Sequence, residues 1–433
     1  MFRLKENQTT VKTEMLAGLT TFLTMAYIIV VNPIILAAAG VHIYQVFMAT
    51  IIAAVIGTGW LALCANYPIA VAPGMGLNAY FTYTVVQASN GQIDYITAFS
   101  AVFVAGIIFI ILSLTPFREK LITAIPENLK LAITAGIGLF IAFIGLRMAK
   151  VVEGDPDNLV KLGDITSPSV LLTLFGLAVT MILMARNVKG ALFVGMVVTS
   201  IAGVLTNQLH INKVVALPHL PEGILVWNPI EAVSNVISYG LYGVVFSFIL
   251  VTLFDTTGTM IGVAKQAGIM KDNKLPRARK ALLADSVATT AGAMFGTSPT
   301  TAFLESGAGV AAGGRTGLTS LTVAGLFIVA SFFGPLVASI SNVAAITSPA
   351  LIIVGSLMIG SVKHIEWDKF EYSFPAFLII LAMPLTSSIS TGIAIGFISY
   401  PLLMVVKGKG REVHHLMYIF AVLFIIQLAF LPH

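Results

Sequence analysis

Long apolar stretches separated by short polar connections extend along the whole chain. Most are 15 to 25 residues long, the length that a helix needs to cross the ~30 Å hydrocarbon core of a bilayer. The pattern therefore predicts an all-α polytopic membrane protein. The fifteen apolar segments are 15–39, 46–65, 75–89, 95–115, 128–149, 168–186, 190–207, 238–262, 281–296, 303–313, 317–336, 345–362, 371–385, 387–406 and 413–431.

Two of these segments, 75–89 and 303–313, are too short to cross as helices. They lie within or after proline-containing stretches, "NYPIAVAPGMGLNAYF" (Asn66–Phe81) and "FGTSPTTAFLESGAG" (Phe295–Gly309). Proline disfavours helix, and "AVA" and "TTAF" favour extended backbone. Unpaired backbone costs several kcal/mol per group in hydrocarbon, so such stretches must pair or line a polar cavity. We predict two short strands that cross antiparallel near the midplane, each leading into a half-helix whose N-terminus faces a ligand.

The longest polar connection, 208–237, divides the chain near its middle. The two interrupted segments lie at comparable places in the two halves. Such a pair is the best indicator of a transporter site that a sequence offers.

Basic residues in short loops predict the orientation. If each segment crosses once, four basic clusters share one side, which we assign to the cytoplasm together with the N-terminus. The first fourteen residues are polar and charged, so we expect no cleaved signal peptide. Arg147 and Lys150 fall on the other side, and the basic run 407–411 leaves the side of the C-terminus open. The four clusters are Arg3 with Lys5 and Lys12, Arg118 with Lys120, Arg186 with Lys189, and the loop 271–280.

Composition agrees with a membrane protein and excludes several functions. Hydrophobic residues make up 57% of the chain and charged residues 10%, against about 25% charged in soluble domains. The net charge of +5 resides in short loops without a basic, aromatic-rich patch, so we expect no nucleic-acid partner. There is one cysteine, Cys64, and all seven histidines fall in loops or at the chain end. We therefore expect no metal and no cofactor.

Three acids fall within apolar segments: Asp255, Asp285 and Glu305. An isolated acid at the bilayer centre costs at least about 2.5–3.5 kcal/mol, so protonation, a cavity or a ligand must compensate it. Glu305 begins the second half-helix and Asp255 lies in the eighth segment. Asn78 has a comparable place in the first half-helix, where it could face Glu305. These groups suit a planar, neutral heterocycle with both donors and acceptors, and a proton on an acid could be the coupling ion.

Each of these residues also has a purely structural reading. Asp285 lies close to Arg279 and Lys280, so we favour an interfacial ion pair or cap over a site role, while keeping it as a proton-coupling candidate. Asp255 could bond a neighbouring threonine, Glu305 could cap its own helix, and Asn78 could join helices. "DTTGT" resembles the Asp-Thr-Gly motif of aspartic proteases, but no second copy exists to share a proton. We predict that the protein is not an enzyme.

The long motifs together resemble the hypoxanthine/guanine/adenine permease branch of the nucleobase–cation symporters. They are "GLTTFLTMAYIIVVNPIILAAAGV", "NYPIAVAPGMGLNAYF", "LFDTTGTMIGVAKQAG" and "FGTSPTTAFLESGAGVAAGGRTG", and the similarity covers essentially the whole chain. The resemblance implies import of purine bases by proton symport through a bacterial inner or plasma membrane. It also implies about fourteen transmembrane segments arranged as two inverted seven-helix repeats, each with core and gate parts, and a homodimer. We attribute the extra segment to 371–406, where Pro375 and Pro384 would break one span into two pieces.

The resemblance also implies boundaries and site residues. Asp255 and Glu305 would bind the base, Asn78 would contribute, and backbone near Met75 and Leu304 would bond it. Thr259 stands where relatives that take uracil carry a histidine, so the proton route stays open. The implied parts are a cytoplasmic N-terminus (1–14), a first repeat (15–207, core 15–115, gate 128–207), a connecting loop (208–237) and a second repeat (238–433, core 238–336, gate 345–433).

One alternative function is an anion transporter of the same general fold, of the sulfate or bicarbonate type. Such a carrier would favour neutral or basic groups where this chain has Asp255 and Glu305. A membrane enzyme would need a paired catalytic constellation, which the sequence does not contain, and a passive channel would lack the interrupted repeats. Which purine is preferred cannot be read from the sequence.

Overall fold

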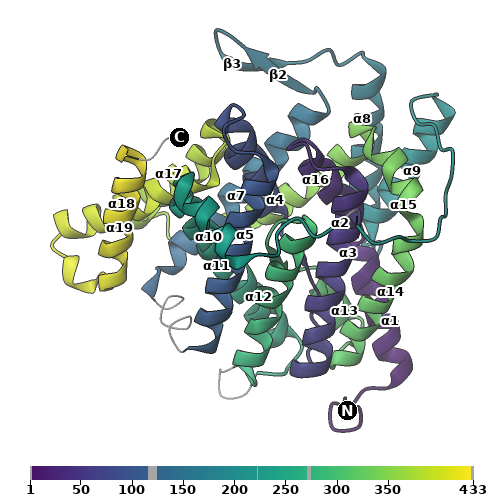
Figure 1. Ribbon diagram of the computed structural model, residues 1–433, viewed down its shortest axis with the longest axis horizontal. Helices are drawn as coiled ribbons and strands as arrows, with labels where there is room; N and C mark the ends of the chain where they lie inside the picture. The colour runs from purple at the N-terminus through teal and green to yellow at the C-terminus, as the bar shows by residue number, and fades with distance from the viewer. Residues whose placement is uncertain (1, 116–123, 222, 271–274, 431–433) are drawn as a thin grey trace.

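The computed structural model describes residues 2–115, 124–221, 223–270 and 275–430, and within these ranges the chain is mostly helical (Figure 1). Arg118, Lys120 and residues 271–274 of the predicted basic loop lie outside them. Nine helical segments of the described ranges are long and apolar enough to cross a bilayer, and the protein is thus a multi-pass helical membrane protein. These segments are Val11–Ala37, Ile43–Ala65, Tyr95–Leu114, Glu127–Met148, Pro168–Ala185, Tyr242–Gln266, Gly317–Ser341, Ala344–His364 and Ile389–Val406.

The first half of the chain contains three of the four strands in the described residues. Its regular elements are α1 (Val11–Met25), α2 (Ile28–Ala37), α3 (Ile43–Trp60), β1 (Val71–Pro73), α4 (Met75–Ala79), α5 (Tyr95–Leu114), α7 (Glu127–Met148), β2 (Val152–Asp155), β3 (Leu159–Leu162), α8 (Pro168–Ala185) and α9 (Ala191–Leu205). Helix α3 continues as a π-helix over Leu61–Ala65, and α4 continues as a π-helix over Tyr80–Val86.

The second half is helical apart from one strand. Its elements are α10 (Pro229–Ser238), α11 (Tyr242–Gln266), α12 (Ala278–Phe295), β4 (Thr300–Ala302), α13 (Ser306–Ala311), α14 (Gly317–Ala330), α15 (Gly334–Ser341), α16 (Ala344–Ile359), α17 (Phe370–Thr386), α18 (Ile389–Val406) and α19 (His415–Phe430). Short 3-10 turns lie at 87–89, 331–333, 360–364 and 410–412.

The predicted antiparallel strand pair is confirmed. Strand β1 pairs with β4, with Ala72 opposite Thr301 and Pro73 opposite Thr300. The ladder extends past both strands, because Gly74 N donates to Pro299 O and Phe303 N donates to Ala70 O, each at 2.9 Å. Each strand is followed by a short helix, α4 or α13, as the proline-rich stretches indicate.

Buried hydroxyls bond the strand backbone that the ladder does not reach. Thr58 on α3 accepts a hydrogen bond from Val71 N and donates one to Val71 O, each at 2.9 Å. Thr289 on α12 accepts from Thr300 N at 2.9 Å. These bonds allow extended backbone inside a helical membrane protein, where an unpaired group is costly.

Small residues let helices approach the strands and each other. A Cβ on Gly57 of α3 would lie 2.7 Å from the Val71 side chain and 2.9 Å from Ala288 of α12. A Cβ on Gly309 of α13 would lie 2.7 Å from Ala17 O of α1. Helices α3, α11 and α12 pack against the strand pair, and α1 packs on α13 and α14. Helix α7 packs mainly on α16 and α17, and α8 on α9 and α16.

Three features differ from the sequence predictions. The stretch 371–406 forms two helices, and the break falls at Ser387, whose φ is +51°, rather than at a proline. The last part of the predicted connection 208–237 is helical, because Asn228 caps α10 by accepting a bond from Ile230 N. Strands β2 and β3 form a hairpin that projects from the helical body at the end opposite the N-terminus (Figure 1).

Candidate functional site

A cavity of about 480 Å³ lies between the strand crossing and a second group of helices. One side is formed by residues of α1, α4, α11, β4 and α13, and the other by residues of α7, α16 and the turn between α8 and α9. The volume lies within the range of roughly 300–1,000 Å³ that is typical of small-molecule sites. The structure thus brings both interrupted segments to one cavity.

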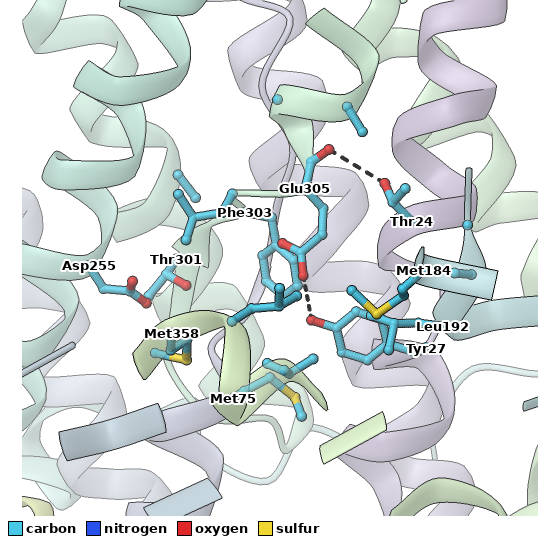
Figure 2. A pocket seen from close by; sticks show the side chains of 18 of the residues that line it. Thr24, Tyr27, Met75, Met184, Leu192, Asp255, Thr301, Phe303, Glu305 and Met358 are labelled. Carbon is cyan, nitrogen blue, oxygen red and sulfur yellow. Dashed lines mark hydrogen bonds between the residues drawn. The ribbon is translucent and has the colours of Figure 1, made fainter. Parts of the chain in front are cut away.

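Glu305 lies half-buried at the start of α13 and lines this cavity. Its Oε1 accepts a hydrogen bond of 2.7 Å from the Tyr27 hydroxyl, as Figure 2 shows. Its backbone carbonyl accepts a longer bond, 3.4 Å, from Thr24 Oγ1. The side chain makes no capping bond to α13, so the helix-cap reading of Glu305 is wrong.

Asp255 reaches the same cavity from the middle of α11. Its carboxylate lies beside Thr301 of β4 (Figure 2). The next residue, Thr256, accepts a bond of 3.3 Å from Ala302 N and thereby fixes α11 to the strand. Two carboxylates therefore open into one cavity from opposite ends of the β4–α13 segment.

Met75 and Leu304, near which the family resemblance implies ligand-binding backbone, also line the cavity. Met75 is buried at the first position of α4, whereas Leu304 is 57% exposed. The remaining wall is largely apolar, with the aliphatic side chains of Ile137 and Leu192. It also contains two thioethers and a ring, which pack well against flat aromatic ligands: Met184, Met358 and Phe303.

Asn78 does not line the cavity. It is fully buried behind Met75, and its Nδ2 donates to Asn32 Oδ1 at 3.0 Å rather than facing Glu305. Asn32 Nδ2 in turn donates to Thr50 Oγ1 at 2.7 Å and to Thr297 Oγ1 at 2.8 Å. This chain of bonds joins α2, α3, α4 and the segment before β4, which is the helix-joining arrangement weighed for Asn78.

Thr259 and Asp285 also lie outside the cavity wall. Thr259 is one turn beyond Asp255 on α11 and only 4% exposed. Asp285 is fully buried on α12, where its Oδ1 accepts from Ser286 N at 2.8 Å and its carbonyl accepts from Thr300 Oγ1 at 2.9 Å. The interfacial ion pair or cap expected for Asp285 stays a prediction.

Three parts of the cavity wall are not predicted from the sequence: Tyr27, Thr24 and the turn between α8 and α9. The apolar run 15–39 reads as one continuous span, yet α1 ends at Met25 and α2 begins at Ile28. A tyrosine in the middle of an apolar span is the available signal, because its hydroxyl needs a partner when buried. Lys189 of the α8–α9 turn lines the cavity on the side away from the strands.

Comparison with known proteins agrees with this architecture. The family model described as "Permease family" matches residues 12–395. The chain is 66% identical to guanine/hypoxanthine permease PbuO of Bacillus subtilis (strain 168), over 99% of each chain. It is 41% identical to adenine permease AdeP of Escherichia coli (strain K12), over 100% of this chain and 96% of that protein.

Solved structures show the fold. The transmembrane domain of the cyanobacterial bicarbonate transporter BicA matches with a TM-score of 0.67 at 15% identity, over 88% of this chain and 97% of that domain. The relatives by sequence are permeases, so the chain is a transport protein and not an enzyme. Its full-length match to the family model and to these permeases shows that the chain belongs to the permease family.

Proposed function

We propose that this chain is a secondary active transporter that imports purine nucleobases, namely hypoxanthine and guanine, with adenine as a further candidate. One observation carries the proposal: Asp255 and Glu305 open into a single cavity whose other walls are largely apolar. Relatives named guanine/hypoxanthine and adenine permeases support the choice of ligand.

The chemistry of this cavity suits a purine base. Carboxylates accept the N–H groups of the ring and of exocyclic amines, and apolar walls take the flat faces. Backbone N–H groups near Met75 and Leu304 would donate hydrogen bonds to the carbonyl oxygen and ring nitrogens of the base. Asn78 would act indirectly, through the position of Met75, with which its amide is in contact at 3.9 Å.

Alternating access would follow from movement of one group of helices against the other. We propose about fourteen transmembrane segments as two inverted repeats, with core parts 15–115 and 238–336 and gate parts 128–207 and 345–433. The cavity lies between residues of these core and gate parts, which supports that division. The N-terminus would be cytoplasmic in a bacterial inner or plasma membrane, and two copies would pair through gate helices, which native mass spectrometry can test.

Proton coupling would use an acid of the core. Glu305 and Asp255 are the principal candidates because both line the cavity, and Asp285 is a third candidate from the neighbouring helix α12. A proton carried with a neutral base moves one charge, which is worth about 2.3 kcal/mol per 100 mV. Accumulation should collapse when a protonophore removes the gradient.

The second candidate function is anion transport, because a bicarbonate transporter domain shares the fold. Two carboxylates in the cavity would repel an anion, while Lys189 offers a single exposed positive charge on the opposite side. At 15% identity the likeness concerns the fold alone.

A panel of uptake assays tests the proposal. Cells lacking their own purine carriers would be supplied with labelled hypoxanthine, guanine, adenine, xanthine, uracil and sulfate. We expect saturable uptake of hypoxanthine and guanine, abolished by a protonophore. Sulfate uptake without any base would refute the proposal and favour the second candidate, and base accumulation that survives the protonophore would refute proton coupling alone.

A further inference from the structure

The first membrane segment is broken at the depth of the cavity. Helix α1 ends at Met25 and α2 begins at Ile28, and a tight turn closes the gap because Ile29 N donates to Ala26 O and Val31 N to Tyr27 O. Tyr27 at this turn is 1% exposed, yet its side chain lines the cavity. Ala26 and Tyr27 keep right-handed helical backbone angles, so the break is a local turn within the span, and the Tyr27 side chain at this turn lines the cavity.

The Tyr27 hydroxyl meets the carboxylate of Glu305. The bond of 2.7 Å from the Tyr27 hydroxyl to Glu305 Oε1 joins two segments that are 278 residues apart in sequence. Hydrogen bonds to a carboxylate are roughly twice as strong as those between neutral groups. The carboxylate retains lone pairs for ligand N–H groups, because each of its oxygens can accept two bonds.

Helix α1 also packs against the start of α13. Thr24 Oγ1 lies 3.4 Å from Glu305 O, although its single hydrogen has a nearer acceptor in Thr21 O at 2.7 Å. One turn along α13, a Cβ on Gly309 would lie 2.0 Å from Thr21 Oγ1, so α13 can approach α1 this closely only with glycine there. The end of α1 thus bonds the side chain of Glu305 and packs closely on the helix that follows it.

We propose that Tyr27 is a positioning residue that holds the Glu305 carboxylate in the orientation that binds the purine. This inference rests on the proposed function and deepens it. A free glutamate side chain has several rotamers, and fixing one of them before the ligand arrives lowers the cost of binding. The affinity of the transporter for the base therefore depends on the Tyr27 hydroxyl, which acts by orienting the Glu305 carboxylate.

A purely structural role makes a different prediction. If the bond only satisfies a buried hydroxyl, its loss lowers the amount of folded protein and leaves the affinity of the folded fraction unchanged. The matched control is Tyr67→Phe. Tyr67 is also fully buried, and its hydroxyl donates to the carbonyl of Pro276 outside the cavity.

The test is a double-mutant cycle of purine uptake with Tyr27→Phe, Glu305→Gln and both together. For Tyr27→Phe we expect KM to rise about tenfold, the size of one lost bond to a charged group, with Vmax per folded transporter little changed. In the Glu305→Gln background, Tyr27→Phe should raise KM by less than about twofold more, because the charge that Tyr27 positions is already absent. Tyr67→Phe should keep the wild-type KM.

Several outcomes would overturn the inference. An unchanged KM for Tyr27→Phe, or effects of the two substitutions that multiply in full, would show that Tyr27 does not act through Glu305. If Tyr27→Phe does not fold, Glu305→Asp retains the charge and withdraws it from Tyr27, and a wild-type KM there would equally refute positioning. Absence of purine uptake by the wild type would instead remove the proposed function, and this inference with it.

Discussion

Replacement of Thr58 by valine should destabilise the strand crossing more than an ordinary buried threonine substitution would. The Thr58 hydroxyl bonds both Val71 N and Val71 O at 2.9 Å, and its side chain is fully buried. These backbone groups of Val71 point away from β4, since the neighbouring Ala70 is the residue that bonds Phe303. Thr58→Val retains the shape of the side chain and removes both bonds.

The magnitude follows from the two groups that lose their partner. A buried polar group without a partner costs about 1–3 kcal/mol, so two groups give an upper range of about 2–6 kcal/mol. Hydrogen bonds measured between membrane helices average only ~0.6 kcal/mol, which gives a lower bound of about 1 kcal/mol for the pair. We expect a loss of about 2–3 kcal/mol of unfolding free energy. The backbone of a strand, unlike that of a helix, has no hydrogen-bond partners within its own segment to replace the lost ones.

The assay is the free energy of unfolding in mixed micelles, with Thr173→Val as the matched control. Thr173 is equally buried, but its hydroxyl bonds only Ser169 O, the carbonyl one turn back in α8, at 3.0 Å. The control should lose less than about 1 kcal/mol, since the carbonyl retains its helical bond. Equal losses in the two variants would refute the reasoning that the hydroxyl of Thr58 stabilises the crossing.

Three further predictions concern the cavity and the helices around it. Gly309→Ala should separate α13 from α1 and raise KM for the base, because its Cβ would lie 2.0 Å from Thr21 Oγ1; an unchanged KM would show that this approach is dispensable. Leu304→Cys, after replacement of the single native cysteine, should react with a thiol reagent and be protected by hypoxanthine, since Leu304 is exposed in the cavity; equal labelling with and without the base would place the ligand elsewhere. Glu371→Gln should lower the thermal unfolding temperature, because the carboxylate bonds Lys407 Nζ at 2.6 Å and joins α17 to the end of α18; thermal unfolding identical to that of wild type would contradict this.

Much of the fold could be predicted because the membrane restricts what a backbone can do. Proline and β-prone residues within apolar segments that are too short to cross leave few possibilities besides paired strands at depth, and β1 pairs with β4 as expected. The β2–β3 hairpin and helix α10 lie in polar connections, where no such restriction acts. The break at Tyr27 was missed because hydrophobicity does not distinguish one bent span from a straight one.

The segments that form the candidate site could be predicted from the sequence, but the direction in which each side chain points could not. Asp255 and Glu305 line the cavity, since a charged residue at mid-span requires a special environment. Met75 and Leu304 line it too, but the family resemblance, not their residue type, indicated them. Asn78 occupies the expected half-helix, yet its side chain points to Asn32. Which face of a five-residue helix meets the ligand depends on helix rotation, and hydrophobic periodicity over so short an element does not define it.

The central claim is that Asp255 and Glu305 together bind a purine base in one cavity. Equilibrium binding of labelled hypoxanthine and guanine to the purified wild type, Asp255→Asn and Glu305→Gln tests it most directly, with Asp157→Asn in the exposed β2–β3 turn as the control. Each cavity variant should lose about 1–3 kcal/mol of binding free energy, because a ligand donor loses its charged partner, while the control keeps wild-type affinity. Wild-type affinity in both cavity variants would contradict the account.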